Sequence, residues 1–242
     1  MERLLTQARE MAEEGVKELI LVAQETTVYG TDIYGKKSLH VLLKELCKIS
    51  GIRWIRVLYC YPEEIYDELI ETIRDEKKIC HYLDLPIQHA SDAILKKMGR
   101  RTSKAQLVDT IRTLREEIPD ITLRTTLITG FPGETEEQHQ ELVEFVDEME
   151  FDRLGVFTYS PEENTPAAEM ADQVPEEVKE ERRDELMELQ QEIAFDRAEE
   201  RTGSVVTAMI EGKVADEDAY VARTYGDAPN VDCLLYTSPS PR

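Results

Sequence analysis

Gly130, Gly133 and Glu134 are the residues of this chain whose types and spacing best suit the binding of a small polar ligand. They lie in the stretch ITLRTTLITGFPGETEEQ, which reads as a buried strand, a glycine-rich turn and a capped helix in direct succession. Glycine adopts backbone conformations closed to residues with a Cβ and lets the main chain approach a ligand closely. The order strand, glycine turn, helix therefore predicts a ligand site at the end of the strand.

The pattern of the strand before the turn supports this prediction. Leu123 and Leu127 lie on one face of the strand, whereas Arg124 and Thr126 lie on the other. A strand covered by helices on both faces would be apolar on both, so the polar face indicates a lumen that holds a polar ligand. An ordinary connection, in which glycine only relieves a tight turn, remains the alternative.

The helix after the turn has its own start signal. Thr135 followed three residues later by Gln138 is a capping-box pattern. A helix that begins here directs its free backbone amide groups toward whatever lies above the end of the strand. Glu134, just before the cap, either contacts the ligand or only favours the helix amino terminus.

Helical and strand-like segments alternate along the first two thirds of the chain. Five strands separated by helices, with no tight hairpin signals between them, predict a parallel sheet with helical crossovers. The expected strands are 18–24, 53–59, 81–87, 121–129 and 153–159, and the expected helices are 2–14, 38–49, 62–74, a short one from 91, 103–117 and 135–149.

Parallel α/β barrels place their chemistry at the carboxyl ends of the strands. Those ends carry polar and aromatic residues here, and the candidate ligand-binding residues are Gln24, Gln88, Arg124, Gly130, Gly133, Glu134 and Tyr159. Each has a structural alternative. Gln24 could cap the following loop, Arg124 could form an internal ion pair with Asp84, and Tyr159 could be a core residue.

His81, His40 and His139 are interpreted as surface or packing residues. His89 lies at the rim but lacks the partners of a general base, so it is left out of the site. No residue is assigned a catalytic role.

Composition bounds the class of protein. The chain has 242 residues, of which 41% are hydrophobic and 33% charged, as in globular proteins. No apolar run approaches the roughly 18 residues that span a bilayer, and a charged amphipathic helix begins the chain, so we expect a cytoplasmic protein without a membrane partner. The formal net charge of −22 makes nucleic acid an unlikely partner and a basic protein an easier one. Most of this charge could also serve solubility alone.

The four cysteines, Cys47, Cys60, Cys80 and Cys233, match no local metal-binding spacing. We therefore predict no metal site and no disulfide within this chain. Cys60, at a strand end, is interpreted as a small apolar filler rather than a ligand.

The composition changes beyond Pro161. A long charged helix is expected over 175–201, followed by two strand-like segments at 205–210 and 219–224. Two strands are marginal alone in water, so this part is interpreted as an incomplete antiparallel domain. The last ten residues, CLLYTSPSPR, have no pattern that completes it and are interpreted as a non-native tail.

Six blocks of the sequence, taken together, resemble the radical S-adenosylmethionine (SAM) methylthiotransferases, and they cover nearly the whole chain up to Asp232. The blocks are ELILVAQETTVYGTD, RVLYCYPEEIYDELI, LDLPIQHASDAILKKMGRR, LRTTLITGFPGETEEQ, FTYSPEENTPAAEM and VARTYGDAPNVD. Within the family, AQETTVYG, LYCYPEEI and TYGDAPNVD are most similar to the RimO type, which modifies an aspartate of ribosomal protein S-twelve.

The resemblance implies a fold of the α/β class, a partial parallel (β/α) barrel of the radical SAM type, followed by a long helix and an incomplete antiparallel β (TRAM-like) domain. The expected divisions are a barrel over 1–172 that lacks its first βα unit, a connecting helix over 173–201, a TRAM-like part over 202–232 and the tail over 233–242. In this family the barrel holds SAM beside a 4Fe–4S cluster, and a second cluster lies in another domain.

The resemblance also implies roles for the candidate residues. Gln24 is expected to bond the amino-acid end of SAM, Gln88 the ribose or the methionyl group, and Arg124 the carboxylate. Gly130, Gly133 and Glu134 would pass beside the adenine or the methionyl group, and Tyr159 would lie near the adenine.

One feature of the family is missing. The three cluster cysteines, spaced Cys-x-x-x-Cys-x-x-Cys, would precede Glu2, and no remaining cysteines have that grouping. We therefore expect the cluster ligands only in the full-length enzyme, a chain truncated at both ends, and no activity in this polypeptide. Implied partners are ribosomal protein S-twelve and an electron donor. The alternatives are a tRNA adenosine methylthiotransferase of the MiaB type and a non-catalytic α/β scaffold that binds a protein.

Overall fold

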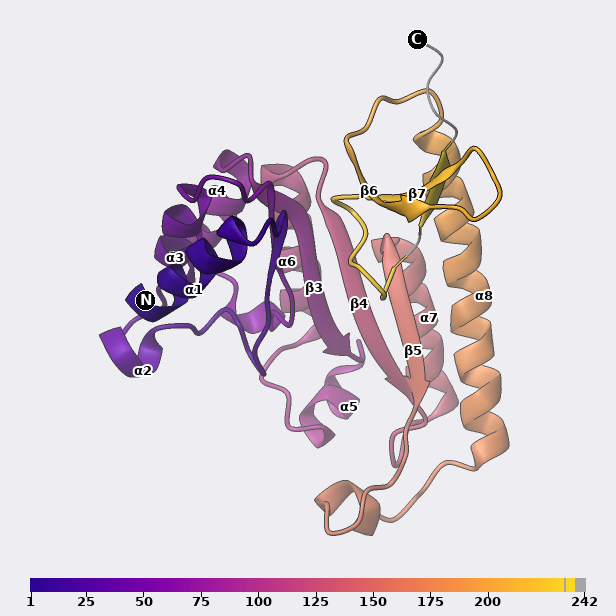
Figure 1. Cartoon of the computed structure of the whole chain (residues 1–242). Coiled ribbons are helices and arrows are strands. Elements are labelled where there is room, and N and C mark those ends of the chain that lie inside the picture. The colour runs from indigo at the N-terminus through magenta and orange to yellow at the C-terminus, as the bar shows by residue number, and fades with distance from the viewer. Residues whose placement is uncertain (233, 238–242) are drawn as a thin grey trace.

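The computed structural model describes residues 1–232 and 234–237, and its centre is a five-stranded parallel sheet (Figure 1). The strands follow one another in the order of the sequence: β1 (Glu18–Leu21), β2 (Trp54–Val57), β3 (Ile79–Gln88), β4 (Thr122–Thr129) and β5 (Arg153–Thr158). All four pairings are parallel. The predicted parallel sheet with helical crossovers is confirmed.

The first strand is shorter than expected, because pairing with β2 ends at Leu21. The Leu58 amide still donates to the Leu21 carbonyl, but the next bond between these two segments runs from the Thr26 amide to the Tyr59 carbonyl. Gln24 therefore lies in an irregular, exposed segment after the strand.

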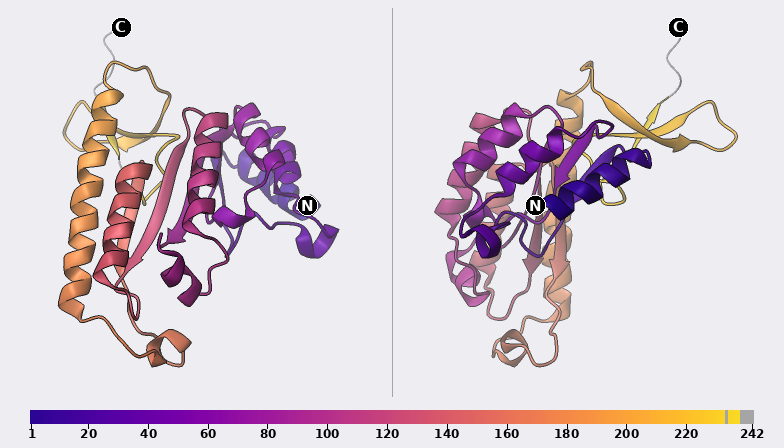
Figure 2. Two further views of the ribbon diagram at one scale, coloured as in Figure 1. Left: turned by 180° about the vertical axis from the view of Figure 1, so that it is seen from behind. Right: turned by 60° about the vertical axis from the view of Figure 1, so that its left-hand side comes forward.

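Helices cover one face of the sheet (Figure 2). The crossovers contain α3 (Leu39–Cys47), α4 (Asp67–Asp75), α6 (Lys104–Glu117) and α7 (Glu136–Met149), with α1 (Glu2–Glu13) before the first strand and short turns at α2 (Thr31–Tyr34), η1 (Pro62–Glu64), α5 (Asp92–Lys97) and η2 (Pro166–Glu169). The capping box of Thr135 and Gln138 is confirmed. The helix expected over 62–74 is divided, because Ile65 and Tyr66 have extended backbones between η1 and α4.

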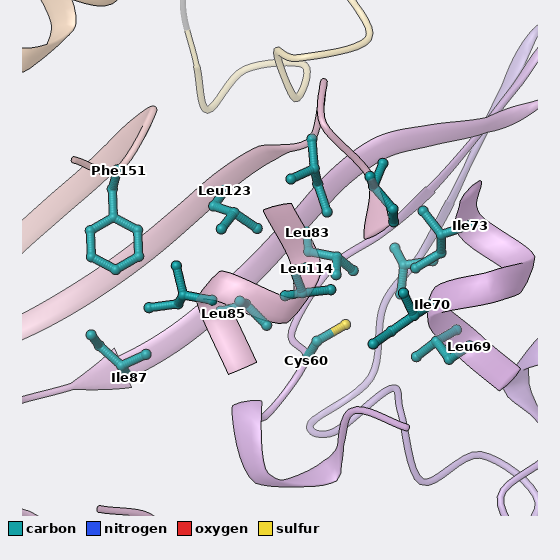
Figure 3. Packing of buried hydrophobic residues seen from close by; sticks show 14 of the residues in the cluster. Cys60, Leu69, Ile70, Ile73, Leu83, Leu85, Ile87, Leu114, Leu123 and Phe151 are labelled. Carbon is teal, nitrogen blue, oxygen red and sulfur yellow. The ribbon is translucent and has the colours of Figure 1, made fainter. Parts of the chain in front are cut away.

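The core lies between the sheet and this helical layer (Figure 3). Leu83 and Leu85 of β3 and Leu123 of β4 are fully buried there, together with Leu114 of α6. Cys60 lies in the same cluster with no exposed surface. Its interpretation as an apolar filler is confirmed.

No described helix covers the opposite face of the sheet, which we call the inner face (Figures 1 and 2). Asp84, Arg124 and Thr126 lie on it, as the alternation of β4 predicts. Toward the carboxyl ends of the strands this face is open, since Val22 and Phe157 are each 61% exposed. The sheet is therefore two-sided, with an apolar face under helices and a mixed face that is open at one end.

A long helix and a small antiparallel sheet complete the described chain. Helix α8 (Glu176–Glu200) runs beside β5, and β6 (Ala208–Lys213), β7 (Tyr220–Thr224) and β8 (Leu235–Thr237) form the second sheet near the amino ends of β4 and β5 (Figure 1). The sequence pattern showed no strand after Asp232, but Leu235 to Thr237 pair antiparallel with β7 as a third strand of this sheet. The other tail residues, Cys233 and 238–242, lie outside the described residues.

Burial predicts how the thiols react. Burial raises the pKa of the Cys60 thiol well above its usual value, so Cys60 is expected to resist maleimide in the folded protein and to react in concentrated guanidinium chloride. Half-buried Cys47, whose pKa is raised to about 11 chiefly by burial, is the internal comparison and should be labelled faster. Peptide mass spectrometry after timed labelling measures both rates, and labelling of native Cys60 at the rate of Cys47 would contradict the packing.

Candidate functional site

Three adjacent strands end in residues with a left-handed backbone, all at the same edge of the sheet. Tyr59 follows β2 with φ 57°, Gln88 ends β3 with φ 71°, and Gly130 follows β4 with φ 70°. Only one of the three is a glycine, and a left-handed conformation at other residues costs on the order of 1–3 kcal/mol. Such strain is concentrated at binding sites, so this edge is where a ligand site is expected.

Glu134 holds the loop after β4 in place. Its side chain is fully buried, and its Oε2 accepts hydrogen bonds from the amides of Gly130 at 2.8 Å and Phe131 at 3.3 Å. Its Oε1 accepts from Nη1 of Arg182, on α8, at 2.8 Å. The carboxylate is thus committed to the protein's own loop and to α8, which goes beyond the simple helix-end role considered as the alternative.

His89, which was left out of the predicted site, also faces this carboxylate. Its ring is fully buried, Nδ1 accepts from the Ser91 amide at 2.9 Å, and Nε2 lies 3.5 Å from Oε2 of Glu134. That separation is too long for a hydrogen bond, and Nε2 has no other partner among the described residues. Burial alone would raise the pKa of Glu134, but His89, Arg182 and the Gly130 amide together hold it below its usual range.

The two glycines face the protein's own chain. A Cβ on Gly130 would clash with Cγ of Lys179, on α8, and one on Gly133 would lie 2.5 Å from Nζ of Lys97. Lys179 in turn donates from Nζ to the Tyr159 carbonyl at 2.8 Å. The turn therefore needs glycine for its backbone angles and for the close passage of neighbouring side chains.

Tyr159 packs as a core residue. It is 9% exposed, and its ring meets the Phe131 ring edge-to-face with centroids 5.2 Å apart. Its buried hydroxyl has no hydrogen-bond partner within the described part of the chain. The ring is thus part of the packing around the Gly130 loop.

Arg124 forms the internal pair considered as its alternative. Nη1 donates to Oδ1 of Asp84 at 2.7 Å, and Nε lies 3.5 Å from Oδ1 of Asp232. Tyr82 donates its hydroxyl to the other oxygen of Asp232 at 2.8 Å. This cluster fixes the segment before β8 against the inner face.

Gln24 and Gln88 are the candidate residues least committed to internal contacts. Gln24 is exposed, and Gln88 is partly buried with only a long bond from Nε2 to the Pro86 carbonyl, at 3.4 Å. Both lie at the strand-end edge, after β1 and at the end of β3. Their amides can donate and accept, as recognition of a polar ligand requires.

Side chains left out of the predicted site tie the strand-end loops together. Glu25 accepts from the amides of Thr27 and Tyr61, both at 2.8 Å, and so joins the loops after β1 and β2. Arg100 stacks over the Tyr61 ring at 4.4 Å and donates to the Pro86 carbonyl at 2.9 Å. Burial raises the pKa of Glu25, against the hydrogen bonds that lower it.

Sequence reasoning also missed Lys179 and Arg182 on α8. They are buried basic residues on one face of an acidic helix, at 5% and 7% exposure. Lys179 and Arg182 are three residues apart and lie on the same face of the helix as Leu186. This spacing was the signal in the sequence that both side chains could be buried.

A model of the Radical SAM superfamily matches residues 1–146, which contain β1 to β4, the crossovers between them and most of α7. The chain belongs to the radical SAM superfamily. No group of three His, Cys, Asp or Glu side chains that could hold a metal ion occurs among the described residues. None of the described helices is long and apolar enough to span a membrane.

Curated relatives extend the similarity to nearly the whole chain. The protein named ribosomal protein uS12 methylthiotransferase RimO of Lachnoclostridium phytofermentans is 63% identical over 236 residues, which are 98% of this chain and 54% of that protein. The protein of the same name in Clostridium botulinum strain Langeland is 52% identical over 97% of this chain and 52% of its own length. The resemblance to the RimO type is confirmed, and the chain spans about half the length of these relatives.

Among solved structures, SuiB of Streptococcus suis bound to S-adenosylmethionine matches with a TM-score of 0.49 and 20% identity. The match covers 83% of this chain and 40% of that one.

A methyl group at Gly130 tests the contact between the loop and α8. Gly130→Ala is expected to destabilise the fold by about 2 kcal/mol more than Gly99→Ala, because overpacking a close contact costs roughly 1–3 kcal/mol. The two glycines share a left-handed backbone, with φ of 70° and 76°, but a Cβ at Gly99 would have nothing within 4 Å. Urea unfolding measures the unfolding free energy of both variants. Equal losses of stability would show that the Lys179 side chain moves aside without destabilising the fold.

Removing the charge of Glu134 tests the buried pair. Glu134→Gln is expected to cost about 3–5 kcal/mol at neutral pH, because the buried Arg182 then keeps only the exposed Glu136 as an ionic partner. Glu136→Gln is the matched control, since Glu136 meets the same guanidinium at 3.1 Å but is 75% exposed, and it should cost less than about 1 kcal/mol.

The same variant has a defined pH dependence. The folded pKa of Glu134 lies below its ordinary value of 4.5, so the ionised carboxylate stabilises the fold fully above that value and loses this effect as the pH falls through the folded pKa. The gap in unfolding free energy between the parent chain and Glu134→Gln should therefore shrink below about pH 4.5. A difference in unfolding free energy that stays constant as the pH falls below this value would contradict the lowered pKa of Glu134.

Proposed function

We propose that this chain is the SAM-binding part of a methylthiotransferase of the RimO type, acting on an aspartate of ribosomal protein uS12. The observation that carries the proposal is the 63% identity to a RimO protein over 98% of the chain. It is supported by the strand-end edge, where strained backbone, uncommitted amides and exposed apolar side chains lie together.

The residues at this edge fit SAM, which joins a charged amino-acid end to an apolar purine. Gln24 and Gln88 offer amide groups with few internal bonds, and Val22 and Phe157 offer apolar surface that water now covers. When bound beside a reduced 4Fe–4S cluster, SAM supplies the means to remove hydrogen from an unactivated carbon. The residues named here would bind and orient the molecule.

In this proposal Gln24 bonds the amino-acid end, and Arg124 faces the carboxylate while Asp84 holds the guanidinium in place. Gln88 bonds the ribose or the methionyl group. The Gly130 to Glu134 loop, fixed by Glu134 and Arg182, lies beside the adenine or the methionyl group, with Tyr159 packed behind Phe131. The loop contributes by staying rigid, because its charged groups are already paired.

A cluster is a different case, because the described residues do not fit one. Cys60 and Cys80 are buried, and no three ligands come together. In the proposal, the three cysteines of the cluster belong to the longer protein, as does the domain with a second cluster, and no step is assigned here to residues of this chain. The isolated polypeptide is accordingly expected to be inactive.

The charge supports a protein substrate over tRNA. A chain with a formal net charge of −22 repels a polyanion and attracts a basic protein. Methylthiolation by the longer protein, assayed on uS12 and on tRNA in parallel, decides between the RimO and MiaB types. An electron donor is required for either.

Binding of SAM by the 242-residue chain tests the site itself. Isothermal calorimetry with SAM should show saturable binding, and Gln24→Ala or Gln88→Ala should weaken it by about tenfold each, the effect of losing one hydrogen bond of roughly 1.4 kcal/mol. Gln7→Ala, at an exposed position of α1, is the control and should bind as the parent does.

Two results would count against this assignment. Equal binding by all three variants would remove Gln24 and Gln88 from the site. Absence of binding, both here and in a longer polypeptide that carries the Cys-x-x-x-Cys-x-x-Cys motif, would favour the non-catalytic scaffold.

A further inference from the structure

Strand β5 is an edge strand within the described chain, since it pairs with β4 alone. Helix α8 runs alongside it (Figures 1 and 2). Between the beginning of β5 and the middle of α8 lies a groove of about 550 Å³, whose lining includes Leu154, Asp184, Met187, Glu188 and Gln190. The groove follows the unpaired edge of the sheet.

An unpaired strand edge is a template for another strand. Successive side chains of an added strand point to opposite sides of the sheet. Exposed apolar residues lie on both sides of the β5 edge. Met187, 41% exposed, lies in the groove on the side of α8, and Phe157, 61% exposed, lies on the inner face. Alternate side chains of an added segment would cover these two residues.

Gln190 carries a second sign of a missing partner. Its Nε2 donates to the Phe151 carbonyl at 2.8 Å, which fixes the amide at the groove. Its Oε1 is buried and has no hydrogen-bond partner among the described residues, and the residue is only 5% exposed. A buried acceptor without a donor is unfavourable, so an N–H group entering the groove would gain a bond at this atom.

The charge of the groove selects the partner. Asp184 and Glu188 are exposed at its wall, while Arg153, which also lines it, pairs with Asp227 at 2.6 Å. A second copy of this chain would bring another net charge of −22 to the contact, which opposes self-association through this edge. A basic segment is attracted by the same field.

We propose that the β5 edge and the groove beside α8 bind an extended basic peptide segment as an added strand. If the proposed function is also right, this segment belongs to the basic protein substrate. The two can fail separately, because peptide binding is measured without SAM, and SAM binding without peptide.

The probe is a fluorescent peptide of roughly ten residues in which lysine alternates with valine, added to the 242-residue chain. Fluorescence anisotropy should show saturable binding, and hydrogen exchange should show new protection of amides in β5. N-methylation of alternate residues along one edge of the peptide should abolish binding, whereas N-methylation along the other edge should spare it, because only one edge pairs with β5. A peptide with glutamate in place of lysine should not bind.

Charge reversal tests the groove directly. The double variant Asp184→Lys with Glu188→Lys should weaken binding of the lysine peptide by about fivefold or more, as expected when charges flanking an interface are reversed. The control pair, Glu192→Lys with Asp196→Lys, changes the net charge equally on another flank of the same helix, outside the groove, and should change affinity much less. Thermal unfolding of each variant confirms that the fold is retained.

Three outcomes would overturn the proposal. Equal binding of both N-methylated peptides would reduce the interaction to charge alone. An equal loss in the two charge-reversed pairs would place the peptide elsewhere on α8. Concentration-dependent dimers that compete with the peptide would assign the edge to a second copy of the chain.

Discussion

The buried ion pair of Glu134 and Arg182 is the interaction on which the rest of the site depends. Two ions removed from water are stable only when each is paired and hydrogen-bonded, so the loop after β4 and helix α8 must meet in one arrangement. Glu134 meets that condition with two backbone amides and the guanidinium. On the same helix, Lys179 lies across Gly130. This charge pair thus joins the loop after β4 to the helix whose later turns line the open edge of the sheet.

A second network closes the other end of the inner face. Arg56 is fully buried and donates to Glu18 at 2.8 Å, and Arg223 of β7 pairs with the same carboxylate. Farther along the strands, Arg124 joins Asp84 to Asp232. The segment TYGDAPNVD therefore covers the inner face near the amino ends of the strands. This is a physical reason for the similarity to RimO proteins to continue through a segment so far from the glycine turn.

The sequence predicted what depends on neighbours along the chain. Periodicity and capping placed the parallel sheet, the crossovers and the Thr135 cap, and alternation placed Arg124 on the polar face. Most contacts between distant residues were beyond it, and the pair of Arg124 with Asp84 entered only as an alternative. Arg182 lies 48 residues from Glu134, and nothing local indicates that the two meet. The approach of His89 to Glu134 was not foreseen for the same reason. Strand β8 was not foreseen because three residues paired only by β7 carry no periodic signal.

The distribution of charge explains why the candidate residues with few internal bonds are neutral, whereas Arg124 would face the proposed ligand only while it stays paired with Asp84. The charged side chains near the glycine turn and on the inner face, including Glu134, Arg182, Asp84 and Arg124, have partners within the chain. What remains at the carboxyl ends of the strands is the amides of Gln24 and Gln88 and apolar surface such as Phe157. Such groups lose less on desolvation than ions do, so a ligand that bonds the amides can displace their water without breaking an ion pair. Because β5 ends at the same edge as β3 and β4, a peptide paired along β5 would reach the edge at which the proposed function places SAM.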